Sequence, residues 1–217
     1  MITRHLTLPL FAAAASALLL SACTTNTPPA PASSSASMSS PAASSASPSG
    51  GATGAVAPFV EINCADQAGG KPVDAPPSGA AELGGVYVTA DAKGVPVVTI
   101  AADLPPASEL GSVDLAVGDG KEVKADDTIT FNYCGIGEAS RTLFDSSWVR
   151  GEPLSFALAR LIPGWQKGIP AMNVGGSRLL VIPGELAYGE NPPPGIGVNE
   201  TLVFVVQIKS IDKQENT

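Results

Sequence analysis

Histidine is almost absent from this chain of 217 residues, because the sequence holds only His5. His5 lies at the start of an N-terminal segment that we expect to be removed by processing. The mature chain then has no imidazole to activate a serine or cysteine nucleophile, and none to bind zinc. This absence excludes most hydrolases, and we expect neither a metal nor a cofactor.

Positive charge is also scarce. Twelve Lys and Arg residues stand against 20 Asp and Glu residues, which gives a formal net charge of −8. Proteins that bind nucleic acid attract the phosphate backbone with a basic surface. This acidic chain has no such attraction to offer, so no nucleic-acid partner is expected.

The longest apolar run is too short for a typical membrane span. Met1–Ala22 has a short basic start and an apolar stretch, Leu6–Leu20, which is the pattern of a secretory signal peptide. The alternative is a retained anchor, but about 15 apolar residues with Pro9 among them fall short of the ~20 that a span needs. The end of the segment, Leu20–Cys23, resembles the lipobox of bacterial lipoproteins. We therefore expect a lipid on Cys23 and an extracytoplasmic domain anchored to the cell membrane.

Cysteine is rare as well, and only Cys64 and Cys134 lie beyond Cys23. Export places both in an oxidising compartment, where pairing is more common than a catalytic thiol. We predict a Cys64–Cys134 disulfide, with two separate buried thiols as the alternative. Such a bond closes a long loop and stabilises a fold by roughly 2–4 kcal/mol.

Charge is missing altogether from Thr24–Val60, which consists mostly of Ser, Ala, Pro, Thr and Gly. Such a segment cannot bury enough apolar surface to offset its ordering entropy, so we predict a disordered tether. The expected organisation is a signal peptide (1–22), the tether (23–60), an N-terminal extension (61–111), a main domain (112–212) and a tail (213–217).

Alternating apolar residues predict strands in the extension and in the main domain. In the extension the predicted strands are Gly85–Thr89 and Val95–Ile100, with Pro96 at a strand start or edge. In the main domain they are Val113–Val117, Thr128–Ile136, Arg178–Ile182 and Thr201–Ile211. Pro163–Met172 has helical spacing and is the single short helix expected. This order predicts an α+β fold in which an antiparallel sheet curls over one helix.

Aromatic residues make up 5% of the chain, yet eight of the eleven lie in its last hundred positions. Most belong to short phrases, namely T-I-T-F-N-Y (Thr128–Tyr133), L-F-D-S-S (Leu143–Ser147), R-G-E-P-L-S-F (Arg150–Phe156), L-I-P-G-W (Leu161–Trp165), L-A-Y-G (Leu186–Gly189) and T-L-V-F (Thr201–Phe204). Together and in this order, the phrases resemble the FKBP-type peptidyl-prolyl cis-trans isomerases over about Val113–Ile211. The resemblance implies a five- or six-stranded antiparallel sheet around a short helix.

The resemblance also implies a role for each residue of an aromatic pocket. Trp165 is the floor on which the proline ring rests. The walls are Tyr133, Phe144, Phe156 and Phe204, and the rim is Leu161 and Ile162, with the Ile162 N–H donating to the ligand. Asp145 and Tyr188 give polar contacts, the Tyr188 hydroxyl donating to the substrate carbonyl; Arg150 pairs with Asp145, and Ala187 plays a supporting part.

The function implied is rotation of X-Pro bonds in exported proteins by a monomer without a cofactor. The planar imide resists rotation with a barrier of ~18–20 kcal/mol, which preferential binding of the twisted form lowers without a nucleophile. The macrolides rapamycin and tacrolimus are expected to bind in the pocket. Two alternatives stay open: a catalytically weak proline-binding chaperone or adhesion lipoprotein, and an unrelated β-rich structural lipoprotein.

Three features depart from the family pattern. The loop Pro183–Glu200 continues with Gly195–Glu200 where the family usually has Ile-Pro-Pro, and it is shorter. Gly184 stands where a second proline is common, and Val205 replaces an acidic residue frequent on the outer face of the last strand. None of these positions belongs to the pocket walls, so we expect activity with an altered sequence preference.

Overall fold

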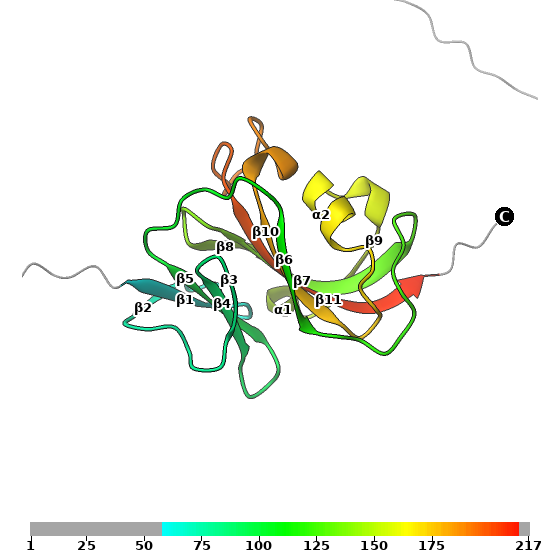
Figure 1. Ribbon diagram of the computed structural model, residues 1–217, viewed down its shortest axis with the longest axis horizontal. Coiled ribbons are helices and arrows are strands. Elements are labelled where there is room, and N and C mark those ends of the chain that lie inside the picture. The colour runs from blue at the N-terminus through cyan, green and yellow to red at the C-terminus, as the bar shows by residue number, and fades with distance from the viewer. Residues whose placement is uncertain (1–57, 213–217) are drawn as a thin grey trace, which may run out of the picture. The chain divides into compact units, whose positions relative to one another are not determined.

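The computed structural model describes residues 58–212 (Figure 1). The predicted signal peptide, the lipidation site Cys23, nearly all of the tether and the tail 213–217 lie outside the described residues, so those expectations stay predictions. Within residues 58–212, no helix has the length and apolar character needed to cross a membrane.

Six antiparallel strands form the sheet of the main domain (Figure 1). They are β6 (Gly111–Ala116), β7 (Thr128–Gly137), β8 (Thr142–Ser146), β9 (Leu154–Ala157), β10 (Ser177–Ile182) and β11 (Leu202–Asp212). The order is β6-β10-β11-β7-β8, and β9 pairs with β7 as well. The α+β fold and the four strands predicted for this domain are confirmed, with slightly shifted ends.

The helices are shorter than expected, and there are two of them in the described residues. The predicted helix ends early: α2 spans Pro163–Gly168. Pro170 brings no N–H to continue it, and Ala171 has a positive φ of 66° that no helix contains. A second helix, α1 (Ser147–Arg150), was not predicted; its N-cap is Ser146 and Gly151 ends it with φ 79°. Two 3₁₀ turns, η1 (Leu158–Arg160) and η2 (Gly184–Leu186), complete the helical elements.

The main sheet is buried on both faces along Leu202–Val206 of β11, and this stretch is apolar at every position. On β11, Phe204 and Val206 point into an inner hydrophobic cluster that includes Trp165 of α2. The intervening Val203 and Val205 belong to an outer cluster shared with the extension. Val205 is 1% exposed. The outer face that Val205 occupies is therefore covered, and an apolar residue suits it.

The extension forms its own five-stranded antiparallel sheet, of order β2-β1-β5-β4-β3. Its strands are β1 (Phe59–Asn63), β2 (Lys71–Val73), β3 (Ala81–Leu83), β4 (Val86–Ala90) and β5 (Pro96–Ala101). The two predicted strands correspond to β4 and β5, and Pro96 does begin a strand. The expected end of the tether at Val60 is wrong by two residues, because Phe59 and Val60 lie in β1 and pair with Ala101 and Ile100.

Cys64 fastens this extension to the main sheet. Cys64 and Cys134 form the predicted disulfide, with 5.6 Å between their Cα atoms, and both are fully buried. The backbone N–H of Cys64 donates to the carbonyl of Pro96, and its carbonyl accepts from the hydroxyl of Ser146. Cys134 follows Tyr133 and Ser146 follows Asp145, so both attachments are made next to predicted site residues.

Candidate active site

A break along one edge of β7 creates the site. β8 pairs with Cys134–Gly137, whereas β9 pairs with Thr128–Phe131, so Tyr133 lies between the two partner strands. Its backbone N–H donates instead to the Ser147 hydroxyl of α1, at 2.9 Å. The short helix thus replaces a strand at the point where the Tyr133 side chain enters the inner cluster.

The centre of the inner cluster is the indole of Trp165. Its ring centroid lies 5.0 Å from that of Phe131, 5.7 Å from Tyr133 and 5.2 Å from Phe204, in edge-to-face arrangements. Phe144 meets Phe204 edge-on at 5.7 Å. Pairs of this geometry contribute about 0.5–1.5 kcal/mol each beyond their burial, so the rings hold one another in place. Trp165 is 4% exposed, as a floor requires.

Above this floor lies a hollow of about 310 Å³. Its lining contains all nine residues to which the sequence assigned a pocket role: Tyr133, Phe144, Asp145, Phe156, Leu161, Ile162, Trp165, Tyr188 and Phe204. Two more, Phe131 and Leu154, were missed. Period-two spacing could have found them, because Phe131 precedes Tyr133 by two residues and Leu154 precedes Phe156 by two. The supporting residue Ala187 lies outside the lining and packs against the inner cluster.

The polar side of the hollow is a triad of Tyr133, Asp145 and Arg150. The Asp145 carboxylate accepts hydrogen bonds from the Tyr133 hydroxyl and from Nη1 of Arg150. Nη2 of Arg150 donates to the Tyr133 hydroxyl at 3.2 Å, and the guanidinium carbon lies 5.3 Å from the tyrosine ring centroid. The predicted pairing of Arg150 with Asp145 is therefore present, and it fixes the carboxylate at the mouth of the hollow.

Burial raises the pKa of both tyrosine hydroxyls of the hollow. Desolvation, followed by the hydrogen bond to Asp145, raises the pKa of Tyr133 to about 12. Desolvation and the nearby Asp145 charge also raise the pKa of Tyr188. Burial would lower the pKa of Arg150, but its contacts with Tyr133 and Asp145 outweigh this and raise it. Both hydroxyls can therefore donate hydrogen bonds throughout the neutral range.

Three hydrogen-bond donors at the hollow have no protein partner among residues 58–212. They are the indole Nε1–H of Trp165, the backbone N–H of Ile162 and the hydroxyl of Tyr188, which is on a residue 39% exposed. Ile162 is the N-cap of α2, where backbone N–H groups are left without intrahelical acceptors. An occupant with carbonyl oxygens can satisfy such donors.

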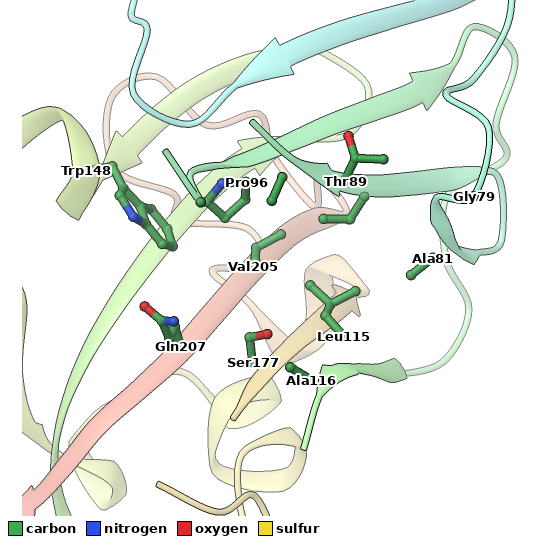
Figure 2. A pocket seen from close by; sticks show the side chains of 13 residues that line it. Gly79, Ala81, Thr89, Pro96, Leu115, Ala116, Trp148, Ser177, Val205 and Gln207 are labelled. Atoms are coloured by element: carbon green, nitrogen blue, oxygen red, sulfur yellow. The ribbon is translucent and has the colours of Figure 1, made fainter. Parts of the chain in front are cut away.

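A second hollow, of about 340 Å³, opens between the two sheets (Figure 2). Side chains of both sheets and Trp148 of α1 line it, including Pro96 and Val205. Its lining contains no acid, no base and no cysteine, so its polar side chains are limited to hydroxyl and amide groups. Trp148 is half-buried and also packs against the outer cluster. The aromatic hollow is therefore the candidate active site.

Comparisons with known proteins agree with the geometry. A sequence model of the family described as FKBP-type peptidyl-prolyl cis-trans isomerase matches residues 120–209. The chain is 39% identical over 120 residues to the FK506-binding protein of Streptomyces anulatus, a match that covers 54% of this chain and 96% of that protein. The chain belongs to the FKBP-type peptidyl-prolyl cis-trans isomerase family.

Other relatives match a little under half of this FKBP-type chain. A probable FK506-binding protein of Corynebacterium glutamicum is 42% identical over 109 residues, which cover 49% of this chain and 90% of that protein. FkpA of Escherichia coli is 47% identical over 94 residues, or 43% of this chain and 34% of that protein. The crystal structure of FkpA covers 60% of this chain and 52% of that one, at 38% identity and a TM-score of 0.46. The predicted family and enzyme class are confirmed, and β1 to β6 precede the residues matched by the family model.

Proposed function

We propose that this FKBP-type isomerase accelerates X-Pro rotation in exported proteins by binding the twisted imide in the aromatic hollow. The observation that carries the proposal is the hollow itself, an apolar cup closed below by Trp165 and edged by donors without protein partners. Uncatalysed exchange takes tens to hundreds of seconds. Turnover of roughly 1–10³ s⁻¹ requires the barrier to fall by about 3–7 kcal/mol, at 1.36 kcal/mol per decade.

Each part of the site has a task in that step. The proline ring rests on the Trp165 indole, which excludes water from the imide. The planar imide is more polar than the twisted one, so a dry aromatic cup favours the twisted form. The Tyr188 hydroxyl donates to the substrate carbonyl, and the Ile162 N–H holds the substrate backbone. Tyr133 and Arg150 hold the Asp145 carboxylate in place beside the rotating bond.

The rest of the proposal concerns the setting of the enzyme. A lipid on Cys23 would anchor the chain to the outer side of the cell membrane, with the Ser/Ala/Pro-rich tether as spacer. Its partners are proline-containing proteins that fold after export, and it acts as a monomer. Two relatives are named for binding FK506, which supports binding of tacrolimus and rapamycin in the aromatic hollow of this chain.

Proline-limited refolding of a model protein tests the activity. The mature chain without its lipid should accelerate the slow refolding phase at micromolar concentration, and rapamycin should abolish the acceleration. Tight rapamycin binding without acceleration would overturn the enzymatic proposal in favour of a proline-binding chaperone. Labelling with a palmitate analogue tests the anchor, because Cys23→Ala should abolish incorporation and leave the chain unanchored.

A further inference from the structure

Glu200 is a buried acid at the end of the long loop Pro183–Glu200. It is 8% exposed, and each of its carboxylate oxygens accepts a backbone hydrogen bond. Oε1 accepts from the N–H of Ser140 at 2.8 Å, and Oε2 accepts from the N–H of Gly197 at 2.7 Å. Ser140 lies in the turn between β7 and β8, whereas Gly197 lies in the long loop. One carboxylate therefore joins two segments of the chain.

Both segments carry residues of the aromatic hollow. The β7–β8 hairpin supplies Phe144 and Asp145, and the long loop supplies Tyr188. Ile196, directly before Gly197, packs against the inner cluster. Directly before Glu200, the N–H of Asn199 donates to the carbonyl of Gly189, in the first half of the loop, at 2.9 Å. Fixing Gly197 and Glu200 therefore fixes the end of the loop that carries Ile196.

The chain leaves room for this carboxylate. A Cβ on Gly137 would overlap with Oε1 of Glu200 and with the hydroxyl of Ser140. Hydrogen bonds to an ionised carboxylate are stronger than those between neutral groups, and an ionised carboxylate has only acceptors to offer. The absence of a side chain at Gly137 therefore makes room for the carboxylate of Glu200.

We propose that Glu200 is a positioning residue that holds the loop in the shape met by the substrate and thereby sets KM. The inference rests on the proposed isomerase function of the same hollow. Its effect falls most on substrates with a large apolar residue before the proline, because the loop end held by Glu200 carries the partly buried apolar side chain of Ile196 beside the inner cluster. The N–H groups of Ala187 and Gly189 both donate to the carbonyl of Gly184, so Tyr188 between them is held without Glu200 and kcat is little affected.

The decisive variant is Glu200→Gln, with Glu185→Gln as its matched control. Glutamine has the same shape, but its amide nitrogen cannot accept a hydrogen bond, so one of the two backbone donors loses its partner. Glu185 lies in the same loop, is exposed and has no hydrogen-bond partner for its side chain among the described residues. We expect Glu200→Gln to raise KM for Leu-Pro peptides about tenfold at unchanged kcat, the equivalent of about 1.4 kcal/mol, and to affect Ala-Pro peptides less.

A double-mutant cycle tests the same arrangement from the other side. Gly137→Ala should displace the carboxylate and raise KM as Glu200→Gln does. In a Glu200→Ala background the overlap with the carboxylate is gone and only the small Ser140 hydroxyl has to rotate away, so Gly137→Ala should have little further effect on KM. Additive effects of the two changes, or a Glu200→Gln enzyme with wild-type KM for both peptides, would overturn the inference.

Amide hydrogen exchange separates this inference from the proposed function. The N–H groups of Ser140 and Gly197 should exchange slowly in the wild type and in Glu185→Gln, and about tenfold faster in Glu200→Gln. An inactive wild type with this exchange pattern would overturn the proposed function but leave the positioning role of Glu200 intact. Equal exchange in all three proteins would overturn the positioning role of Glu200, whatever the activity.

Discussion

The hydroxyl of Ser146 donates a hydrogen bond to the backbone carbonyl of Cys64, with 2.6 Å between the two oxygens. The same hydroxyl accepts from the N–H of Trp148 and so caps α1, the helix that ends at Arg150. Ser146 is 3% exposed. The buried Ser146 side chain, directly after Asp145, therefore links the extension to α1, the helix that carries Arg150.

Replacing Ser146 with alanine should destabilise the protein and weaken catalysis. The change leaves the buried Cys64 carbonyl without its partner and removes the cap of α1, at a combined cost of about 2–3 kcal/mol. Activity should fall severalfold, because Arg150 is then held less firmly against Asp145. Urea unfolding and a peptide isomerisation assay measure the two effects. Ser155→Ala is the control, because Ser155 lies on exposed β9 and its hydroxyl bonds to Asp212 at the surface. Equal stability of the two variants would contradict this account.

The disulfide should contribute stability mainly by restricting the unfolded chain. Cys64 and Cys134 are 70 residues apart in sequence, and closing a loop of that size stabilises by roughly 2–4 kcal/mol. We expect Cys64→Ala/Cys134→Ala to lower the free energy of unfolding by about this amount, as measured in urea without reductant. Reduced wild-type protein should show the same loss. A double variant as stable as the oxidised wild type would show that the extension is held by packing alone.

The pocket was predictable from sequence because its residues sit in fixed short phrases. The nine residues assigned to the pocket come from several separate elements, yet all of them line one hollow. Helix α1 was not predictable, because four residues are too few to show helical periodicity. Its capping serine and terminal glycine, Ser146 and Gly151, were the available signals.

Two departures from the family pattern, Gly184 and Val205, are explained only by contacts between residues that are distant in sequence. A Cβ on Gly184 would overlap with the backbone of Asn199, so the loop excludes a proline or any other side chain at 184. Val205 faces the extension rather than solvent. The first three strands of the extension are short or end in polar residues, so their pairing depends on tertiary contacts that no local pattern reveals.

Removing the Tyr188 hydroxyl should slow catalysis without unfolding the protein. Tyr188 is 39% exposed and its hydroxyl has no partner among the described residues, so Tyr188→Phe costs little stability. A lost hydrogen bond to the twisted imide is worth about 1–1.5 kcal/mol, which corresponds to roughly a tenfold fall in kcat/KM. Tyr87→Phe, in the extension, is the matched control and should leave turnover unchanged. Wild-type turnover in Tyr188→Phe would remove this hydroxyl from the mechanism.

The raised pKa values of Tyr133 and Tyr188 should determine how activity and stability depend on pH. Burial and Asp145 raise the pKa of Tyr133 to about 12, and the pKa of Tyr188 is raised as well. Both donors stay protonated, so kcat/KM should be level from about pH 6 to 9. A raised folded-state pKa means that the unfolded chain releases the proton first. The stability that Tyr133 contributes is therefore complete below about pH 10 and is lost as pH rises toward 12.

Urea unfolding at several alkaline pH values measures that loss. Tyr133→Phe should flatten the decline above about pH 10, because the group that releases the proton is gone. The wild type and the variant should respond alike to pH below that value. A wild-type fall in kcat/KM with a midpoint below about pH 9 would contradict the assignment of Tyr188 as a neutral donor.

An acid at position 205 should destabilise this chain, although an acid is frequent at this position in the family. Val205 is 1% exposed and packs in the outer cluster beneath the extension, so Val205→Asp would bury a carboxylate without a partner. We expect the free energy of unfolding to fall by more than about 3 kcal/mol. Val198→Asp is the control, because Val198 is 63% exposed and a charge there should change stability by less than about 0.5 kcal/mol. Similar, small effects of both changes would mean that the extension leaves the outer face open to water, and the covering role of this sheet would have to be abandoned.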